Sequence, residues 1–186
     1  MYGKNYYKYW GKARKREDGG YDWHLLAYHC LDVAAVGRVW VETDSPLLER
    51  LSSALAVDAD DPRLLDWLGF ILTLHDIGKF DIRFQCKVPE VRQLLWSEPS
   101  PGDMALSEIN VREFDHGSSG YGLFVKQVAG DAFPGDQRDD LLDVWGPWIA
   151  AVTGHHGIVP RQANWTPPAA ERNVLQHDQG LTSLSS

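Results

Sequence analysis

The chain has 186 residues, a net charge of −8 and 44% hydrophobic residues, which suits a single packed domain over residues 1–186. Its longest apolar stretch, Trp67 to Leu74, is far shorter than the roughly 20 residues that span a bilayer. The N-terminus lacks the apolar block of a signal peptide, and the two cysteines form no CxxC pair. We therefore expect a cytoplasmic protein without a disulfide framework.

Residues 1–16 carry six bases and no acid, although 12 bases face 26 acids in the rest of the chain. The bases alternate with Tyr2, Tyr6, Tyr7, Tyr9 and Trp10, a mixture that can stack nucleobases and hold phosphates. The alternative is a solvated arm whose aromatic rings dock on the domain, and we favour it slightly because termini are often charged.

Helical periodicity runs through most of the chain. Leu25 and Leu26, His29, Val33, Val36 and Trp40 recur at steps of three and four residues, which places His29 on the inward stripe of a helix. Ser45-Pro46 predicts a helix start that extends to about Val57. Asp61-Pro62 repeats the pattern and opens the strongest helix, which includes His75 and which Gly78 is expected to end.

The second half is less regular. Residues 80–97 predict a loop and a short helix, residues 98–115 an excursion, and Ser118 to Ala129 a helix. Gly146-Pro147 predicts the start of a further helix that carries His155, and residues 178–186 are expected to form a flexible tail. No alternating strand pattern or internal repeat is found, so the predicted class is all-α.

The dipeptide His-Asp is weak evidence by itself, because 7 histidines and 18 aspartates give about 0.7 chance copies in this chain. His177-Asp178 lies in a polar tail and is interpreted as a solvated dipeptide. His75-Asp76 differs because it closes a long apolar helix and is followed by Gly78 and Lys79. That context predicts the wall of a pocket.

Several other histidines lie in apolar helical stretches or beside glycine. A protein core rarely satisfies so many imidazoles by ordinary hydrogen bonds, so we interpret the set as metal ligands. Asp76 is the natural bridge between two cations because a carboxylate has two oxygens. The predicted ligands are His29, His75, Asp76, His116, His155 and His156.

Imidazole ligands favour Mn, Fe, Co, Ni or Zn over Mg. Two such ions about 3.5–4 Å apart would polarise a phosphodiester, with a metal-bound hydroxide as the nucleophile. We expect Asp76 and Lys79 to be the catalytic side chains, with Lys79 neutralising a phosphate oxygen. An equally supported alternative makes Lys79 a surface residue at the end of a helix.

The motifs together resemble the HD superfamily of metal-dependent phosphohydrolases. Within it the chain is most similar to the N-terminal HD nuclease domain of the type I CRISPR interference helicase-nuclease, in particular its I-E branch. The matching stretches cover most of residues 1–160: Tyr9-Trp10-Gly11-Lys12, HLLAYHCLDVAAVG (24–37), LHDIGKFDIRFQ (74–85), FDHGSSG (114–120) and AVTGHHG (151–157).

The resemblance implies an HD-domain helical bundle with a metal site between helices. It implies a nuclease that cuts single-stranded DNA, fused to or paired with a helicase and recruited by the CRISPR surveillance complex. By motif, His29, His75 and Asp76 belong to one metal, and Asp76, His116, His155 and His156 belong to the other.

One departure concerns an aspartate that family members take from a late helix to complete the first metal site. Here 30 residues follow His156, and Glu171 and Asp178 are the later acids. The first site is therefore expected to be one ligand short, as in an excised fragment or a shortened protein. Two alternatives stay open: a nucleotide phosphohydrolase of the HD superfamily, and a catalytically impaired module that binds the surveillance complex.

Overall fold

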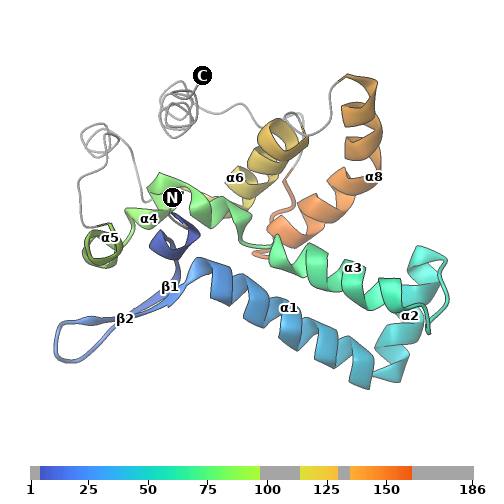
Figure 1. The fold of residues 1–186 in the computed structure, drawn as a ribbon, viewed down its shortest axis with the longest axis horizontal. Helices are drawn as coiled ribbons and strands as arrows, with labels where there is room; N and C mark the ends of the chain where they lie inside the picture. The colour runs from blue at the N-terminus through green and yellow to red at the C-terminus, as the bar shows by residue number, and fades with distance from the viewer. Residues whose placement is uncertain (1–4, 97–113, 130–134, 161–186) are drawn as a thin grey trace.

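The structure, a computed structural model, describes residues 5–96, 114–129 and 135–160. Helices dominate it, as Figure 1 shows, so the predicted all-α class is confirmed apart from one small hairpin. The elements, in chain order, are η1 (Asn5–Lys8), β1 (Trp10–Lys15), β2 (Tyr21–Leu25), α1 (Leu26–Thr43), α2 (Ser45–Leu55), α3 (Pro62–Thr73), η2 (Ile77–Phe80), α4 (Ile82–Gln85), α5 (Pro89–Leu95), α6 (His116–Leu123), η5 (Phe124–Val128) and α8 (Asp136–Thr153).

The sequence did not predict the antiparallel pair β1–β2, which runs directly into α1 (Figure 1). Its outer half is rich in charged residues, which mask any alternation of apolar side chains. The inner end is held instead by Trp10, which is 5% exposed and packs on Phe84. Tyr9 likewise contacts Phe80 and Trp96, so these N-terminal rings dock on the domain as the favoured interpretation expected.

Aspartate caps set the starts of α2 and α3. Asp44 accepts a hydrogen bond from the Leu47 amide, so the cap lies one residue before the predicted Ser45. Asp61 caps α3 as predicted by accepting from the Arg63 amide. At its other end α2 stops at Leu55 rather than Val57, because Ala56 adopts the left-handed conformation with φ of 53°.

The prediction that Gly78 ends the third helix was wrong. Helix α3 stops at Thr73, and His75 and Asp76 lie in the turn that joins it to η2. Here the amides bond three residues back, as in Leu74 to the Ile71 carbonyl and His75 to the Leu72 carbonyl, so the backbone tightens before it reaches the glycine. The two site residues therefore project from a turn.

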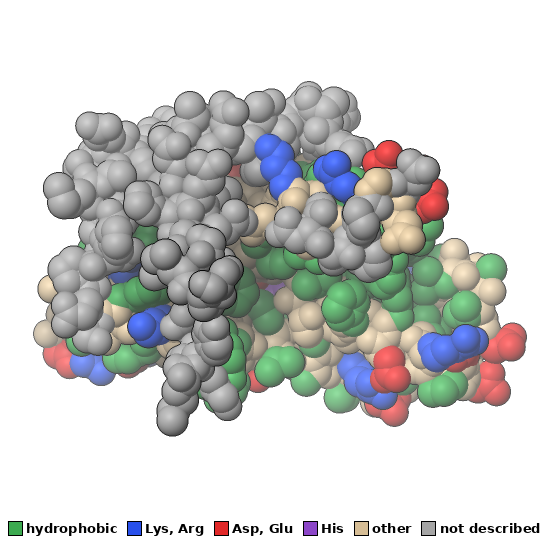
Figure 2. All heavy atoms as spheres, turned by 45° about the horizontal axis from the view of Figure 1, so that its top comes forward, with side chains coloured by type: hydrophobic (Ala, Val, Ile, Leu, Met, Phe, Trp, Pro, Cys, Tyr) green, Lys and Arg blue, Asp and Glu red, His purple; other side chains and the backbone are tan. Residues whose placement is uncertain are grey.

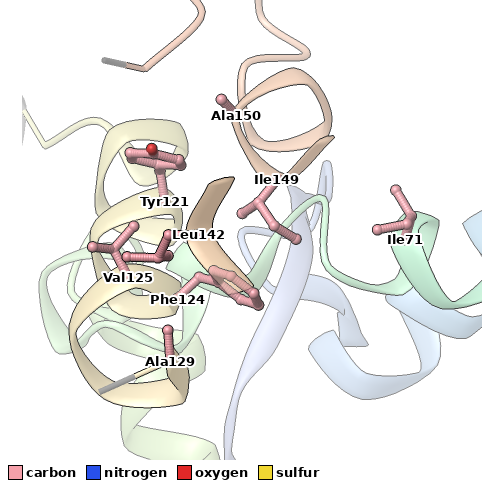
Figure 3. Packing of buried hydrophobic residues seen from close by; sticks show 8 residues of the cluster. All are labelled: Ile71, Tyr121, Phe124, Val125, Ala129, Leu142, Ile149 and Ala150. Atoms are coloured by element: carbon pink, nitrogen blue, oxygen red, sulfur yellow. The ribbon is translucent and has the colours of Figure 1, made fainter. Parts of the chain in front are cut away.

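The second half of the described chain is built around α8. The prediction of a helix start at Gly146-Pro147 was wrong, because α8 begins at Asp136 and Pro147 lies inside it. Apolar residues before the proline hold this first part of the helix against the rest of the domain. Figure 3 shows the resulting cluster, in which side chains of α8 meet those of the α6–η5 helix, with α3 alongside: Ile71, Tyr121, Phe124, Val125, Ala129, Leu142, Ile149 and Ala150.

Other predictions are met approximately or lie outside the described residues. The predicted helix from Ser118 begins at His116 and continues through the π-helix η5 to Ala129. Residues 80–97 form α4 and α5 with short connections. Most of the predicted excursion, the 178–186 tail, and Glu171 and Asp178 fall outside the described ranges. Among the described residues, no helix combines the length and apolar character needed to cross a membrane.

Candidate metal centre

The predicted site residues come from four separate segments. His29 lies in the first turns of α1, and His75 and Asp76 lie in the turn after α3. His116 is the first residue of α6, and His155 and His156 follow the end of α8. The fold brings all six together, although Asp76 and His156, for example, are 80 residues apart in the sequence. On the face in Figure 2, a small area of histidine is visible between hydrophobic side chains.

Asp76 occupies the centre of the cluster and is 1% exposed. Its Oδ2 lies 2.9 Å from His29 Nε2, 3.1 Å from His75 Nε2 and 2.7 Å from Lys79 Nζ. Its Oδ1 lies 3.3 Å from His116 Nε2 and 3.6 Å from His155 Nε2. The two oxygens of one carboxylate thus face different sets of imidazoles.

The ligand atoms fall into two groups, each with all its members within 4.8 Å of one another. One is buried and consists of His29, His75 and Asp76; the other is more exposed and consists of His116, His155 and His156. Within the second group, His116 Nε2 and His156 Nε2 are 3.0 Å apart. The membership is the same as in the two predicted ligand sets, with Asp76 between them.

Hydrogen bonds to the backbone set the orientation of two imidazoles. His75 donates from Nδ1 to the Leu72 carbonyl at 2.8 Å, and His155 donates from Nδ1 to the Val152 carbonyl at 2.9 Å. In the neutral rings each Nε2 therefore carries a lone pair, and both face the Asp76 carboxylate. Lone pairs that face a carboxylate repel it unless a cation lies between them, and this is the arrangement in which histidines bind metals.

The buried Asp76 Oδ1 accepts no hydrogen bond from the residues that the structure describes. An unpaired buried carboxylate oxygen is costly because it has lost its contact with water. A cation shared with His116 and His155 would satisfy it. The donor set of imidazoles and one carboxylate therefore fits divalent transition metals.

The charge states of the cluster suit this use. Burial disfavours the charged form of Asp76, but the charged and polar groups around its carboxylate, Lys79 among them, outweigh burial, so its pKa is well below the usual range. Burial lowers the pKa of His29, and it also lowers the pKa of His155. At neutral pH the aspartate is ionised and these two rings are uncharged, which is the state that binds metal.

Comparison of the sequence with known proteins identifies the family. The sequence model for the HD domain of Cas3 matches residues 10–183, which is nearly the whole chain. The chain belongs to the Cas3 HD domain family. It is 36% identical over 185 aligned residues to the CRISPR-associated endonuclease/helicase Cas3 of Escherichia coli strain K12.

That alignment covers 92% of this chain and 20% of the Escherichia coli protein, so the chain spans about a fifth of its relative's length. All six cluster residues lie within the matched range, residues 10–183. No solved structure matched the chain significantly.

Lys79 is buried, which contradicts its interpretation as a surface residue, and its contact with a phosphate oxygen stays a prediction. It is 9% exposed, so it is not a surface residue. Its Nζ donates to the Gly11 carbonyl at 3.1 Å and forms the ion pair with Asp76. Lys79 therefore holds Asp76 and the first strand together, and its ammonium group is already engaged by protein atoms.

Close backbone contacts position the second group. A Cβ atom on Gly78 would lie 1.9 Å from the His116 carbonyl oxygen, and one on Gly117 would lie 2.5 Å from the Thr153 carbonyl oxygen. The glycines thus allow η2 to touch the start of α6, and α6 to touch the end of α8. This brings His116 to both Asp76 and His155.

Sequence reasoning missed Gln85, which is fully buried and links β1 to the turn that carries the cluster. Its side chain accepts from the Trp10 amide at 3.0 Å and donates to the carbonyls of Trp10 at 3.0 Å and Lys79 at 2.7 Å. Nothing in the local sequence around a single glutamine indicates that its side chain bonds to a strand 75 residues earlier.

Sequence reasoning also missed a cavity of about 560 Å³ that begins beside His29. One end is polar, with Lys12, His24 and Asp32, and the remainder is apolar and extends along α1, α2 and α3. Val36 and Trp40 line it and are 68% and 61% exposed. The stripe predicted to face inward on α1 is therefore buried at His29 but open to this cavity further along.

Proposed function

We propose that this domain is a metal-dependent nuclease that cuts single-stranded DNA in CRISPR interference. The main observation is the buried Asp76 carboxylate, whose two oxygens face two separate groups of imidazoles. Membership of the Cas3 HD family supports the same proposal, because the Escherichia coli relative is named as an endonuclease/helicase.

The two groups would each hold a divalent transition ion, with Asp76 shared between them. When bound, such ions polarise a phosphodiester and supply an activated water. The chain itself contributes the negative charge of Asp76 and the fixed directions of His75 and His155, which their backbone hydrogen bonds determine. Lys79 keeps Asp76 in place and offsets part of its charge in the dry interior.

Single strands are the proposed substrate because a helicase of the kind named in the relative separates duplex DNA. The more exposed group, His116, His155 and His156, offers a strand access from solvent, whereas the first group is buried. As partners we propose a helicase region, fused or separate, and the CRISPR surveillance complex. Both rest on the family resemblance.

The test is a cleavage assay with purified protein loaded with Mn, Fe, Co, Ni or Zn and, separately, with Mg. Single-stranded DNA, duplex DNA, deoxynucleoside triphosphates and cyclic nucleotides are compared side by side. Asp76→Asn is the key variant, and Asp58→Asn, at an exposed position, is the matched control. We expect cleavage of single-stranded DNA by the wild type and the control, and at least a 100-fold loss in Asp76→Asn.

Other outcomes would select the alternatives. Turnover of nucleotides without cleavage of DNA would identify an HD nucleotide phosphohydrolase. Binding of metal at one group or none, with no turnover, would identify a catalytically impaired module. Full cleavage by Asp76→Asn would refute the assignment of the site.

A further inference from the structure

The cation that the sequence assigned to the phosphate, Lys79, already bonds to Asp76 and to the Gly11 carbonyl. A nuclease site still benefits from a positive side chain that reaches the substrate backbone. The residue that follows Gly11, Lys12, fits this need. We propose that Lys12 binds a backbone phosphate of the single strand beside the metal centre, an inference that rests on the proposed nuclease function.

The local backbone directs Lys12 toward the site. The pairing of β1 with β2 shifts register between Trp10 and Lys12, since these residues face Leu25 and His24. Such an irregularity inserts an extra residue and changes the direction of neighbouring side chains, and it is common next to active sites. Lys12 thereby comes to line the same cavity as His29, a member of the buried ligand group.

The position of this strand is also fixed. A Cβ atom on Gly11 would lie 3.0 Å from His29 Cβ, so β1 approaches α1 as closely as a glycine allows. The Gly11 carbonyl accepts the hydrogen bond from Lys79, and Trp10 is tied to Gln85 on both sides of its peptide. The strand backbone that carries Lys12 is therefore held by hydrogen bonds from Lys79 and Gln85.

The charges around Lys12 leave it available for a ligand. Arg14 and Arg16, on the same hairpin, pair with Asp22, whereas no ion pair joins Lys12 to a carboxylate among the described residues. Lys12 is exposed to solvent. The nearby carboxylate in the cavity, Asp32, has a different neighbour, because it lies 3.4 Å from His24 Nε2.

The experiment measures kcat/KM of the metal-loaded chain on a fluorescent single-stranded oligo(dT) across a series of salt concentrations. For single strands, log K falls with log salt by roughly 0.7 for each phosphate that a base contacts. Lys12→Gln is expected to make this slope shallower by roughly 0.7 and to lower kcat/KM at low salt by about fivefold. Lys12→Arg keeps the charge and is expected to retain the wild-type slope.

Lys15→Gln is the matched control, because it removes the same charge from the exposed outer end of the same strand. Equal slopes in Lys12→Gln and Lys15→Gln, with an active wild type, would overturn the role of Lys12 and leave the nuclease proposal standing. A wild-type protein that does not cut oligo(dT) would instead refute the proposed function. Thermal unfolding of each variant checks that the hairpin is intact.

Discussion

Gly78→Ala is predicted to separate the two halves of the metal centre. The added Cβ would lie 1.9 Å from the His116 carbonyl oxygen and 2.6 Å from the Gly120 amide nitrogen, and carbon atoms keep at least 3.0 Å from such atoms. The start of α6 must therefore retreat by about 1 Å relative to η2. His116 moves with it, away from the turn that holds Asp76.

This displacement affects both stability and metal binding. Overpacking of this kind costs about 1–3 kcal/mol of unfolding free energy. Metal–ligand distances tolerate only about 0.2 Å, so we expect the group that contains His116 to lose roughly 10–100-fold in metal affinity. Urea unfolding measures the first effect, and titration with Co²⁺, followed by its visible absorption, measures the second.

Gly69→Ala provides the matched control, because nothing lies within 4 Å of its added Cβ in the middle of α3. Alanine is favoured over glycine inside a helix by roughly 0.5–1 kcal/mol, so this variant should be slightly more stable and bind metal normally. Wild-type stability and Co²⁺ affinity in Gly78→Ala would refute the close contact between η2 and α6.

Three further predictions concern Gln85, the cap of α6 and the effect of removing metal. Gln85→Met should lower the free energy of unfolding, measured in urea, by at least about 2 kcal/mol, because it leaves buried backbone groups of Trp10 and Lys79 unpaired. A smaller loss would contradict the proposed link of Gln85 between β1 and Lys79. Asp115→Ala should cost about 1 kcal/mol at pH 7 by removing the cap of α6. Although burial opposes it, hydrogen bonds from Ser118 and Gly117 lower the pKa of Asp115, so the cap's contribution is present above pH of about 4 and is lost as pH falls further. A difference that does not shrink as pH falls below about 4 would argue against the cap. Removal of metal by a chelator should lower the melting temperature of the wild type, since bound metal stabilises the native state alone, and an unchanged melting temperature would contradict metal binding.

The residues that form the Asp76 cluster were predictable because their chemistry is unusual. Imidazoles beside glycine, and a His-Asp pair in an apolar setting, have few ordinary structural uses, and the Asp76 cluster has the predicted members. The helices α1, α2 and α3 followed from periodicity and from the proline that opens two of them. These are local properties that a sequence displays directly.

The remaining features depend on tertiary contacts. The β1–β2 hairpin is held by Trp10 and Gln85, which are 75 residues apart, so no local pattern could indicate it. Helix α3 ends before His75, and the η2 segment that follows packs closely against the distant α6. The burial of Lys79 likewise arises from its contact with Gly11, a residue of the distant first strand. Pro147 was misread because packing of α8 outweighs the local cost of the proline.

The most direct test of the central claim is elemental analysis of the purified chain after loading with Mn or Co, with Asp76→Asn and Asp58→Asn treated in parallel. If Asp76 joins two groups of imidazoles around cations, the wild type and the control should retain one to two ions per chain, and Asp76→Asn should retain far less. Equal metal content in Asp76→Asn and the wild type, or none in either, would contradict the account.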